Sequence, residues 1–72
     1  MRFYYQRLKD LREDRQIKQQ EVAELLRTTQ QTYSIWERGE RDIPFHHVIT
    51  LAKFYNVSID YIAGLTNHKK VK

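Results

Sequence analysis

The chain has 72 residues, which is enough for one domain with a single hydrophobic core. It has no cysteine, which excludes disulfides and thiolate metal sites, and no apolar run approaches the length of a membrane span. Lysine and arginine outnumber aspartate and glutamate by 13 to 9, and the net charge of +4 fits an ordinary surface as well as a nucleic-acid partner. The chain begins with one charge followed by aromatic residues, which is no signal peptide, so we expect a cytoplasmic protein.

Helix breakers are scarce, with two glycines and one proline, and no β-branched run alternates, so the sequence predicts an all-α fold. The first expected helix covers residues 3–15, and the second covers residues 19–26. A third follows over residues 30–38, with Thr29 as its N-cap and Gly39 as its end. The inward positions expected on the first two helices are Tyr4, Leu8, Leu11, Arg15, Val22, Ala23 and Leu26.

The second half of the chain predicts two more helices. Pro44 suits the first turn of a fourth helix, and Ser58 caps a short fifth helix that Gly64 closes. The inward positions expected on these helices are Val48, Ile49, Leu51, Ala52, Tyr55, Ile59, Ile62 and Ala63. The sequence thus divides into one domain, residues 1–67, and a basic tail, residues 68–72.

Two short helices joined by a tight turn and flanked by further helices form the helix-turn-helix arrangement, which residues 19–39 predict. This segment resembles the phage repressor and Cro family, also called the XRE family. The matching residues are Gln19, Glu21, Val22, Ala23, Leu26, Thr29, Tyr33, Ser34, Trp36, Glu37 and Gly39. The resemblance extends over residues 8–67, through the segments 41–44 and 55–61. It implies a compact five-helix bundle of the lambda repressor-like DNA-binding type, and a transcriptional repressor that binds a palindromic operator as a dimer.

Two positions depart from the family pattern. Arg27 stands in the turn where the family usually has glycine, and a positive φ there costs a non-glycine residue about 1–2 kcal/mol. Either the turn is rearranged or packing absorbs this strain. Lys18 replaces the usual serine or threonine before the first glutamine of the motif, and a lysine side chain cannot accept backbone N–H groups as a cap.

The helix expected over residues 30–38 has two unlike faces. Because a helix turns about 100° per residue, Tyr33 and Trp36 lie together on the side that faces the core and supports the helix. The outward positions expected to contact bases are Gln30, Gln31, Ser34 and Ile35. A glutamine amide can pair twice with the edge of adenine in the major groove, and an isoleucine can contact a thymine methyl group. On a solvated surface the two glutamines would simply be neutral helix formers, but in this motif we interpret them as base-contacting residues.

Three further residues are expected to bind the DNA backbone. Gln19 begins the second helix, where free backbone N–H groups attract an anion, and the matching residue of the family contacts the DNA backbone. Arg38 and Arg41 lie in and just after the third helix, either as phosphate contacts or as solvated surface. In repressors of this family the residues matching Arg12 and Glu37 pair beneath the recognition helix, and we expect the same pair here.

An enzyme is not expected, because no nucleophile–base pair, carboxylate pair or glycine-rich phosphate loop stands out. We expect no cofactor and no metal. His46 and His47 are adjacent, point about 100° apart on a helix and cannot bind one ion together, and His68 is in the tail. The fifth helix and its exit offer Tyr61 and Leu65 as residues of a homodimer interface, and the family commonly dimerises near this helix.

The main alternative to double-stranded DNA as the partner is a protein. A protein–protein module of the same fold, such as an antitoxin or an anti-repressor, would act by binding a protein partner. Specific DNA affinity that falls steeply with salt favours the first interpretation, whereas a stable protein partner without DNA preference favours the second.

Overall fold

The computed structural model describes residues 4–70, and within them the chain forms five α-helices. They are α1 (Tyr4–Asp14), α2 (Gln19–Leu25), α3 (Gln30–Glu37), α4 (Phe45–Tyr55) and α5 (Ile59–Ala63). The expected all-α class and the order of the helices are confirmed, and the ends agree with expectation to within one residue. Phe3, expected to begin the first helix, lies outside the described residues.

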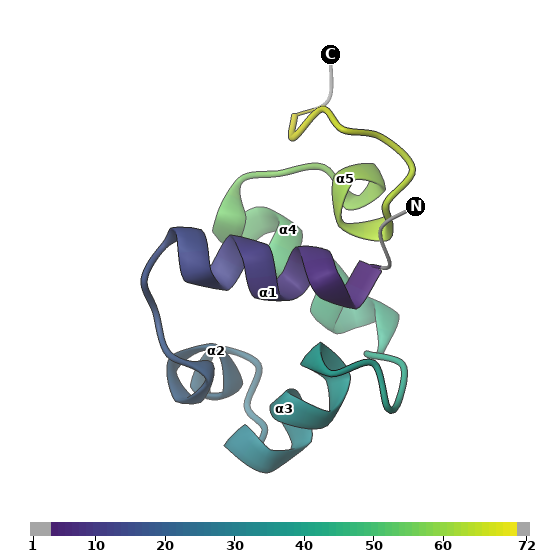
Figure 1. The fold of residues 1–72 in the computed structure, drawn as a ribbon. Helices are drawn as coiled ribbons and strands as arrows, with labels where there is room; N and C mark the ends of the chain where they lie inside the picture. The colour runs from purple at the N-terminus through teal and green to yellow at the C-terminus, as the bar shows by residue number, and fades with distance from the viewer. Residues whose placement is uncertain (1–3, 71–72) are drawn as a thin grey trace.

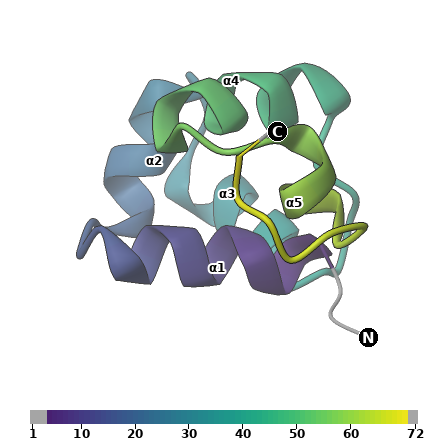
Figure 2. The ribbon, with the colours of Figure 1, turned by 90° about the horizontal axis from the view of Figure 1, so that it is seen from above.

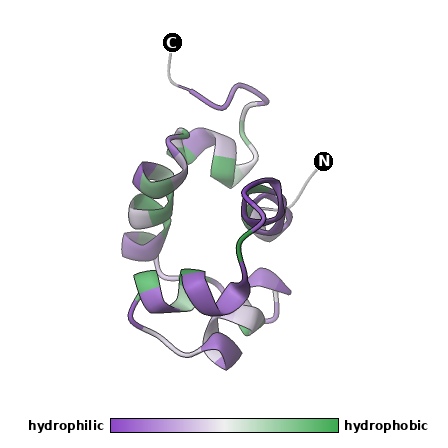
Figure 3. Cartoon of the chain, turned by 90° about the vertical axis from the view of Figure 1, so that its left-hand side faces the viewer, coloured by the Kyte–Doolittle hydropathy of each residue, from purple (hydrophilic) through white to green (hydrophobic). Residues whose placement is uncertain are grey.

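Helix α1 crosses the middle of the molecule between two pairs of helices (Figure 1). On one side α2 packs against α3, and on the other α4 packs against α5; α1 contacts both α3 and α5. Seen from above, α1 and α4 run along opposite edges (Figure 2). In Figure 3 the segment after α5 is hydrophilic, and hydrophobic positions of α4 turn toward the middle of the molecule. The buried hydrophobic residues are Leu8, Leu11, Val22, Ala23, Leu26, Tyr33, Trp36, Ile43, Val48, Leu51, Ala52, Tyr55 and Ile62.

The helix ends are set by the residues that the sequence places there. The hydroxyl groups of Thr29 and Ser58 each accept a hydrogen bond from the backbone N–H three residues on, at 3.1 and 3.0 Å, which confirms both as N-caps. Asn56 and Gly64 end α4 and α5 in the left-handed conformation, with φ of 56° and 83°. Pro44 occupies the N-cap position of α4, one residue before the first turn where it was expected.

The expectation that Arg15 lies on the inner stripe of α1 is wrong. Arg15 directly follows the last residue of α1, Asp14, and its side chain is exposed and donates a hydrogen bond to the Tyr55 carbonyl at 3.1 Å. The buried arginine of α1 is Arg7, whose guanidinium lies 4.1 Å from the ring centre of Tyr61. Burial of Arg7 is compatible with its charge because the aromatic face attracts the cation.

The turn between α2 and α3 keeps the backbone conformation that the family associates with glycine. Arg27 has a φ of 58°, and its backbone N–H donates to the Glu24 carbonyl at 3.1 Å. The next N–H, that of Thr28, donates to the Ala23 carbonyl at 2.9 Å. The turn is therefore not rearranged, and the strain at Arg27 is held by these helix-ending hydrogen bonds. Lys18 is the N-cap of α2 and makes no side-chain cap hydrogen bond, as expected.

The segment after α5 folds back over the helices. The Arg7 guanidinium donates to the Asn67 amide oxygen at 2.9 Å, and the Ser58 backbone N–H donates to the Lys69 carbonyl at 2.5 Å. The Lys69 ammonium lies 3.9 Å from the Asp14 carboxylate. These contacts join residues on both sides of the expected boundary at residue 67 to the helices. Over the described range, no helix is both long and apolar enough to cross a membrane.

Candidate nucleic-acid interface

The outer face of α3 gathers side chains around a shallow hollow. The hollow has a volume of about 340 Å³ and is lined by Gln30, Gln31, Ser34, Ile35 and Arg38. These are the four residues expected to contact bases and one of the three expected to contact phosphates. Gln30 and Gln31 are exposed in the first turn of α3, whereas Ser34 and Ile35 are half-buried. The helix therefore presents amide groups, a hydroxyl, an aliphatic side chain and a guanidinium on one surface.

Two large aromatic residues fix the opposite face of α3 in the core. Tyr33 is fully buried, and Trp36 is 9% exposed. The Trp36 ring centre lies 5.2 Å from that of His47 in α4. The Tyr33 hydroxyl has no hydrogen-bond partner among residues 4–70, and its burial, together with the charge of Glu37, raises its pKa. This anchoring sets the rotation of α3 and hence the residues that face outward.

A charged cluster beneath α3 joins three helices. The expected pair is present: Arg12 Nη2 donates to Glu37 Oε1 at 2.9 Å, and Arg12 Nε donates to Glu37 Oε2 at 3.0 Å. Gln19 Nε2 donates to the same carboxylate at 3.1 Å, and Arg12 Nη1 donates to the Ile17 carbonyl at 3.0 Å. The fork of two parallel hydrogen bonds fixes the orientation of both charged groups. Through Glu37, the start of α2 and the end of α3 are held to α1.

The Glu37 carboxylate is charged in a largely buried place. Its side chain is 3% exposed and that of Arg12 is 14% exposed. Burial acts to raise the pKa of Glu37, but the hydrogen bonds from Arg12 and Gln19 and the charge of Arg12 outweigh it, so the pKa is lowered. The hydrogen bond to Glu37 raises the pKa of Arg12. The pair therefore stays ionised at neutral pH.

The guanidinium of Arg38 is already occupied within the chain. Its Nε donates to the Glu40 carboxylate at 2.6 Å, and its Nη1 donates to the Ser34 hydroxyl at 2.7 Å. The two charged side chains are 54% and 58% exposed, so water screens the pair. The hydrogen bond with Glu40 raises the pKa of Arg38, and the same bond lowers the pKa of Glu40.

The start of α1 holds the loop between α3 and α4, which carries Arg41. Gly39 has a φ of 78°, and a Cβ atom there would lie 2.6 Å from the ring of Tyr5. The Tyr4 hydroxyl donates to the Asp42 carboxylate at 2.7 Å, and burial, followed by this hydrogen bond, raises the pKa of Tyr4 to about 12. Glycine is therefore required at position 39 both by the backbone and by the close approach of an aromatic ring. Arg41 itself is exposed.

Residues 8–62, more than half of the chain, match the sequence model of a family described as helix-turn-helix. The chain belongs to the XRE-type helix-turn-helix family. The match includes the inner face of α3, the Arg12–Glu37 pair and the hollow on α3.

Two curated relatives from Bacillus subtilis (strain 168) are similar to most of this helix-turn-helix chain. The uncharacterized HTH-type transcriptional regulator YobD is 34% identical over 64 residues, which are 89% of this chain and 57% of the relative. The uncharacterized HTH-type transcriptional regulator YqaE is 28% identical over 68 residues, which are 94% of this chain and 59% of the relative. The chain therefore spans less than two thirds of the length of the relatives that it matches.

The fold also occurs in a solved repressor structure. The P22 c2 repressor protein, crystallised in complex with synthetic operator 9T in the presence of Tl⁺, superposes with a TM-score of 0.81. The match covers 92% of this chain and 100% of that chain, at 21% sequence identity. It confirms the expected lambda repressor-like five-helix architecture.

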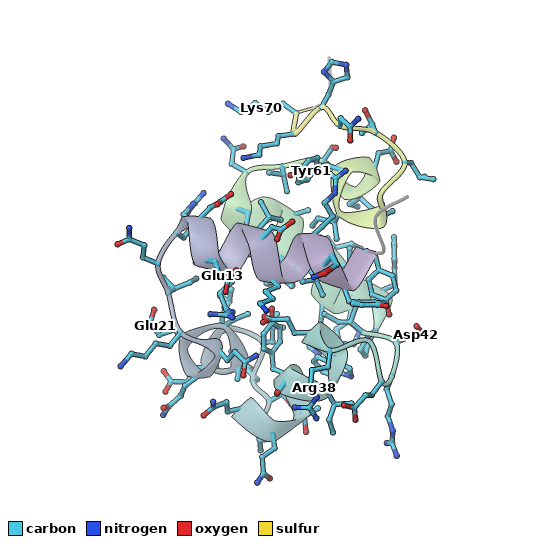
Figure 4. The ribbon with its side chains drawn as sticks, viewed as in Figure 1. Glu13, Glu21, Arg38, Asp42, Tyr61 and Lys70 are labelled. Carbon is cyan, nitrogen blue, oxygen red and sulfur yellow. The ribbon has the colours of Figure 1, made fainter. Side chains whose placement is uncertain are left out.

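Two lysines of the expected basic tail lie far from the outer face of α3. Figure 4 shows Arg38 at the end of the molecule formed by α2 and α3, and Lys70 at the opposite end. Lys69 is engaged on this opposite end by Asp14 and by the backbone of Ser58. The positive charge of Lys69 and Lys70 is therefore separate from the helix-turn-helix surface. Among residues 4–70, no group of three metal-ligating side chains is close enough to hold an ion.

The two residues expected at a dimer interface differ in their surroundings. Leu65 is 78% exposed just after α5, whereas Tyr61 is half-buried and its ring is covered by the Arg7 guanidinium. Phe45, at the start of α4, is also 63% exposed. It lines a second hollow of about 320 Å³, together with Tyr4, Asp42, Ile43, Val48, Ile59, Ile62 and Ala63.

Three residues beside the helix-turn-helix make contacts that the sequence did not predict. Glu40 accepts a hydrogen bond from the Arg38 guanidinium. Tyr4 and Tyr5, from the start of α1, contact the loop that carries Arg41. No local pattern connects Tyr4 and Tyr5 with a loop more than thirty positions away, and helical spacing predicts only that Tyr4 faces inward.

Proposed function

We propose that the protein is a sequence-specific DNA-binding transcriptional repressor that inserts α3 into the major groove. The observation that carries the proposal is the division of α3 into a buried aromatic face and a polar outer face. Tyr33 and Trp36 fix the helix, while Gln30 and Gln31 remain exposed in its first turn, the part of a recognition helix that reaches base edges. The names of the two relatives as transcriptional regulators, and the operator complex of the fold neighbour, support the same conclusion.

The proposed contacts divide into base-reading and backbone-positioning groups. Gln30, Gln31, Ser34 and Ile35 would contact base edges, because they line one hollow on the outer face. Gln19, Arg38 and Arg41 would contact phosphates. A glutamine amide has two N–H donors, so Gln19 can keep its hydrogen bond to Glu37 and donate the other N–H to a phosphate. In this arrangement Glu37 and Arg12 position the backbone contact as well as the recognition helix.

Replacing Gln31 with alanine should weaken binding to the preferred site by about 1–3 kcal/mol and relax the choice of base there. The reason is that the variant loses the amide that distinguishes adenine from other bases, while its exposed position leaves the fold intact. Selection of bound sequences from random DNA, followed by titration of the selected site, measures both effects.

Arg41→Ala provides the contrasting variant in the same assay. It should weaken binding to all sequences alike and lower the slope of log K against log salt by about one unit, since a phosphate contact carries no sequence information. A selected consensus that Gln31→Ala leaves unchanged would contradict the assignment of the reading face. Failure of the wild-type chain to prefer any sequence would contradict the proposed function itself.

We also propose that the protein binds its operator as a homodimer through the end of the molecule that carries α5. One recognition helix contacts only a few base pairs, and a two-fold dimer would place two of them about 34–36 Å apart, on successive turns of a palindromic operator. The exposed Leu65 and the half-buried Tyr61 supply apolar surface at this end. A two-fold interface must be self-complementary, and the exposed Phe45 beside the apolar hollow provides further surface for such a contact.

Leu65→Asp should shift sedimentation toward the monomer and weaken binding to a palindrome far more than binding to an isolated half-site. Leu65 is 78% exposed, so the change should leave the fold intact while placing a charge in the interface. His68→Asp is the matched control, because it adds the same charge to an exposed residue of the same segment and should change neither measurement. An unchanged dimer, or equal losses on both DNAs, would place the interface elsewhere.

A further inference from the structure

Arg38, which is proposed to bind a phosphate, is already hydrogen-bonded to two side chains of the same chain. Its guanidinium bonds Glu40 through Nε at 2.6 Å and Ser34 through Nη1 at 2.7 Å. Both partners are acceptors, as a phosphate oxygen is, and the carboxylate has the same sign of charge as a phosphate. Arg38 lines the hollow of the recognition face, so this pair lies where DNA would approach.

The position of Glu40 is set by the backbone. Its N–H donates to the Ile35 carbonyl at 3.1 Å, and the N–H of Gly39 donates to the Trp36 carbonyl at 3.1 Å. These bonds end α3 in the compact turn that the positive φ of Gly39 allows, and the ring of Tyr5 covers that glycine. The turn therefore places the Glu40 carboxylate beside the side chain of Arg38, two residues earlier in the sequence.

We propose that Glu40 is an intramolecular counterion that competes with DNA phosphate for Arg38 and thereby lowers the affinity and the salt dependence of DNA binding. The inference rests on the proposed DNA-binding function. A phosphate that takes Arg38 must displace the Glu40 carboxylate, which is then left close to the DNA. The freed carboxylate attracts a cation in place of Arg38, which offsets the cation that leaves the phosphate, so this contact releases few cations to the solvent in total.

The exposure of the pair limits the size of the effect. Both side chains are more than half exposed, and such pairs are weak, so displacement of Glu40 is feasible for a phosphate. Removing the carboxylate should strengthen DNA binding about 2- to 5-fold at low salt. It should also steepen the slope of log K against log salt by about one unit, because Arg38 would then release a full cation on binding phosphate.

The experiment compares wild type, Glu40→Gln, Arg38→Gln and the double variant on the selected operator and on random DNA, from about 50 to 200 mM salt. Glu40→Gln should bind both DNAs more tightly and with the steeper slope, and the gain should vanish in the Arg38→Gln background. Glu13→Gln removes the same charge from the exposed surface of α1, and it should not reproduce the change in slope.

Two results would overturn the proposal while the proposed function stands. One is DNA binding by Glu40→Gln that is indistinguishable from wild type. The other is a gain of equal size with and without Arg38, which would mean that Glu40 repels phosphate directly. Absence of DNA binding by the wild-type chain would overturn the proposed function and this inference together. The Arg38 Nε–H resonance of the free protein, which should shift in Glu40→Gln, tests the pair without DNA.

Discussion

Replacement of Trp36 by alanine is expected to lower the free energy of unfolding by about 3–5 kcal/mol, which is comparable to the whole stability of a small domain. Trp36 is 9% exposed and belongs to the buried cluster that α3 shares with α1 and α4. The variant would leave a cavity between α3 and the ring of His47, now 5.2 Å from the Trp36 ring. The orientation of α3 would lose one of its two aromatic anchors, so DNA affinity should fall as well.

Chemical and thermal denaturation measure this loss. Both are followed by circular dichroism, because Trp36 is the only tryptophan and its fluorescence is absent from the variant. Gln31→Ala, on the exposed face of the same helix, is the matched control and should keep the wild-type melting point. Trp36→Phe should fall between the two, since it fills part of the space. A Trp36→Ala variant with native circular dichroism and an unchanged melting point would show that α3 does not depend on this anchor.

The helices could be predicted from the sequence because their signals are local. Apolar residues recur at helical spacing, and capping residues stand at the helix ends: Thr29 and Ser58 at N-termini and Gly64 at a C-terminus. Arg15 was misplaced because helical spacing continues one residue past the end of α1, at Asp14, and does not show that the side chain is exposed and bound to the Tyr55 carbonyl. Helix ends are in general less well defined by sequence than helix interiors.

The outer face of α3 could also be predicted, because helical rotation alone separates Gln31 from Trp36. Apart from the Arg12–Glu37 pair, which the family resemblance implied, the contacts of polar side chains across the molecule could not be predicted. Gln19 shares the carboxylate of Glu37 with Arg12, and this depends on how α2 is placed against α1. The contact of the expected tail with the helices could not be predicted for the same reason. The hydrogen bond from the Ser58 N–H to the Lys69 carbonyl is a tertiary contact, and a run of lysines does not indicate it.

The second large effect is expected at the buried ion pair. Arg12→Ala should lower the free energy of unfolding by about 3–5 kcal/mol, because it leaves the Glu37 carboxylate buried with only Gln19 as an uncharged donor. Glu37→Ala likewise leaves the partly buried guanidinium of Arg12 without its carboxylate partner. In a double-mutant cycle with alanine at both positions, the coupling should exceed about 0.5 kcal/mol, since each single change removes the same two parallel hydrogen bonds. Strict additivity would show that the pair contributes nothing beyond its separate parts.

The pH dependence of stability distinguishes loss of this charge pair from simple loss of packing. In the wild type the pKa of Glu37 is lowered on folding, so its stabilising contribution is present above the ordinary pKa of a glutamate and is lost as the pH falls through the folded value. In Arg12→Ala, burial acts without the compensating charge, and the pKa of Glu37 should rise above its ordinary value. The folded variant then binds more protons than the unfolded one, so the contribution of Glu37 to the free energy of unfolding should become more favourable as the pH falls below neutral.

The difference in unfolding free energy between Arg12→Ala and wild type, measured by urea denaturation, should therefore shrink steadily from pH 7 toward pH 4. The double variant Arg12→Ala/Glu37→Gln, which has no carboxylate to protonate, should lack the improvement on acidification that Arg12→Ala shows. A pH-independent difference between Arg12→Ala and wild type would mean that Arg12 acts through its aliphatic stem and not through its charge.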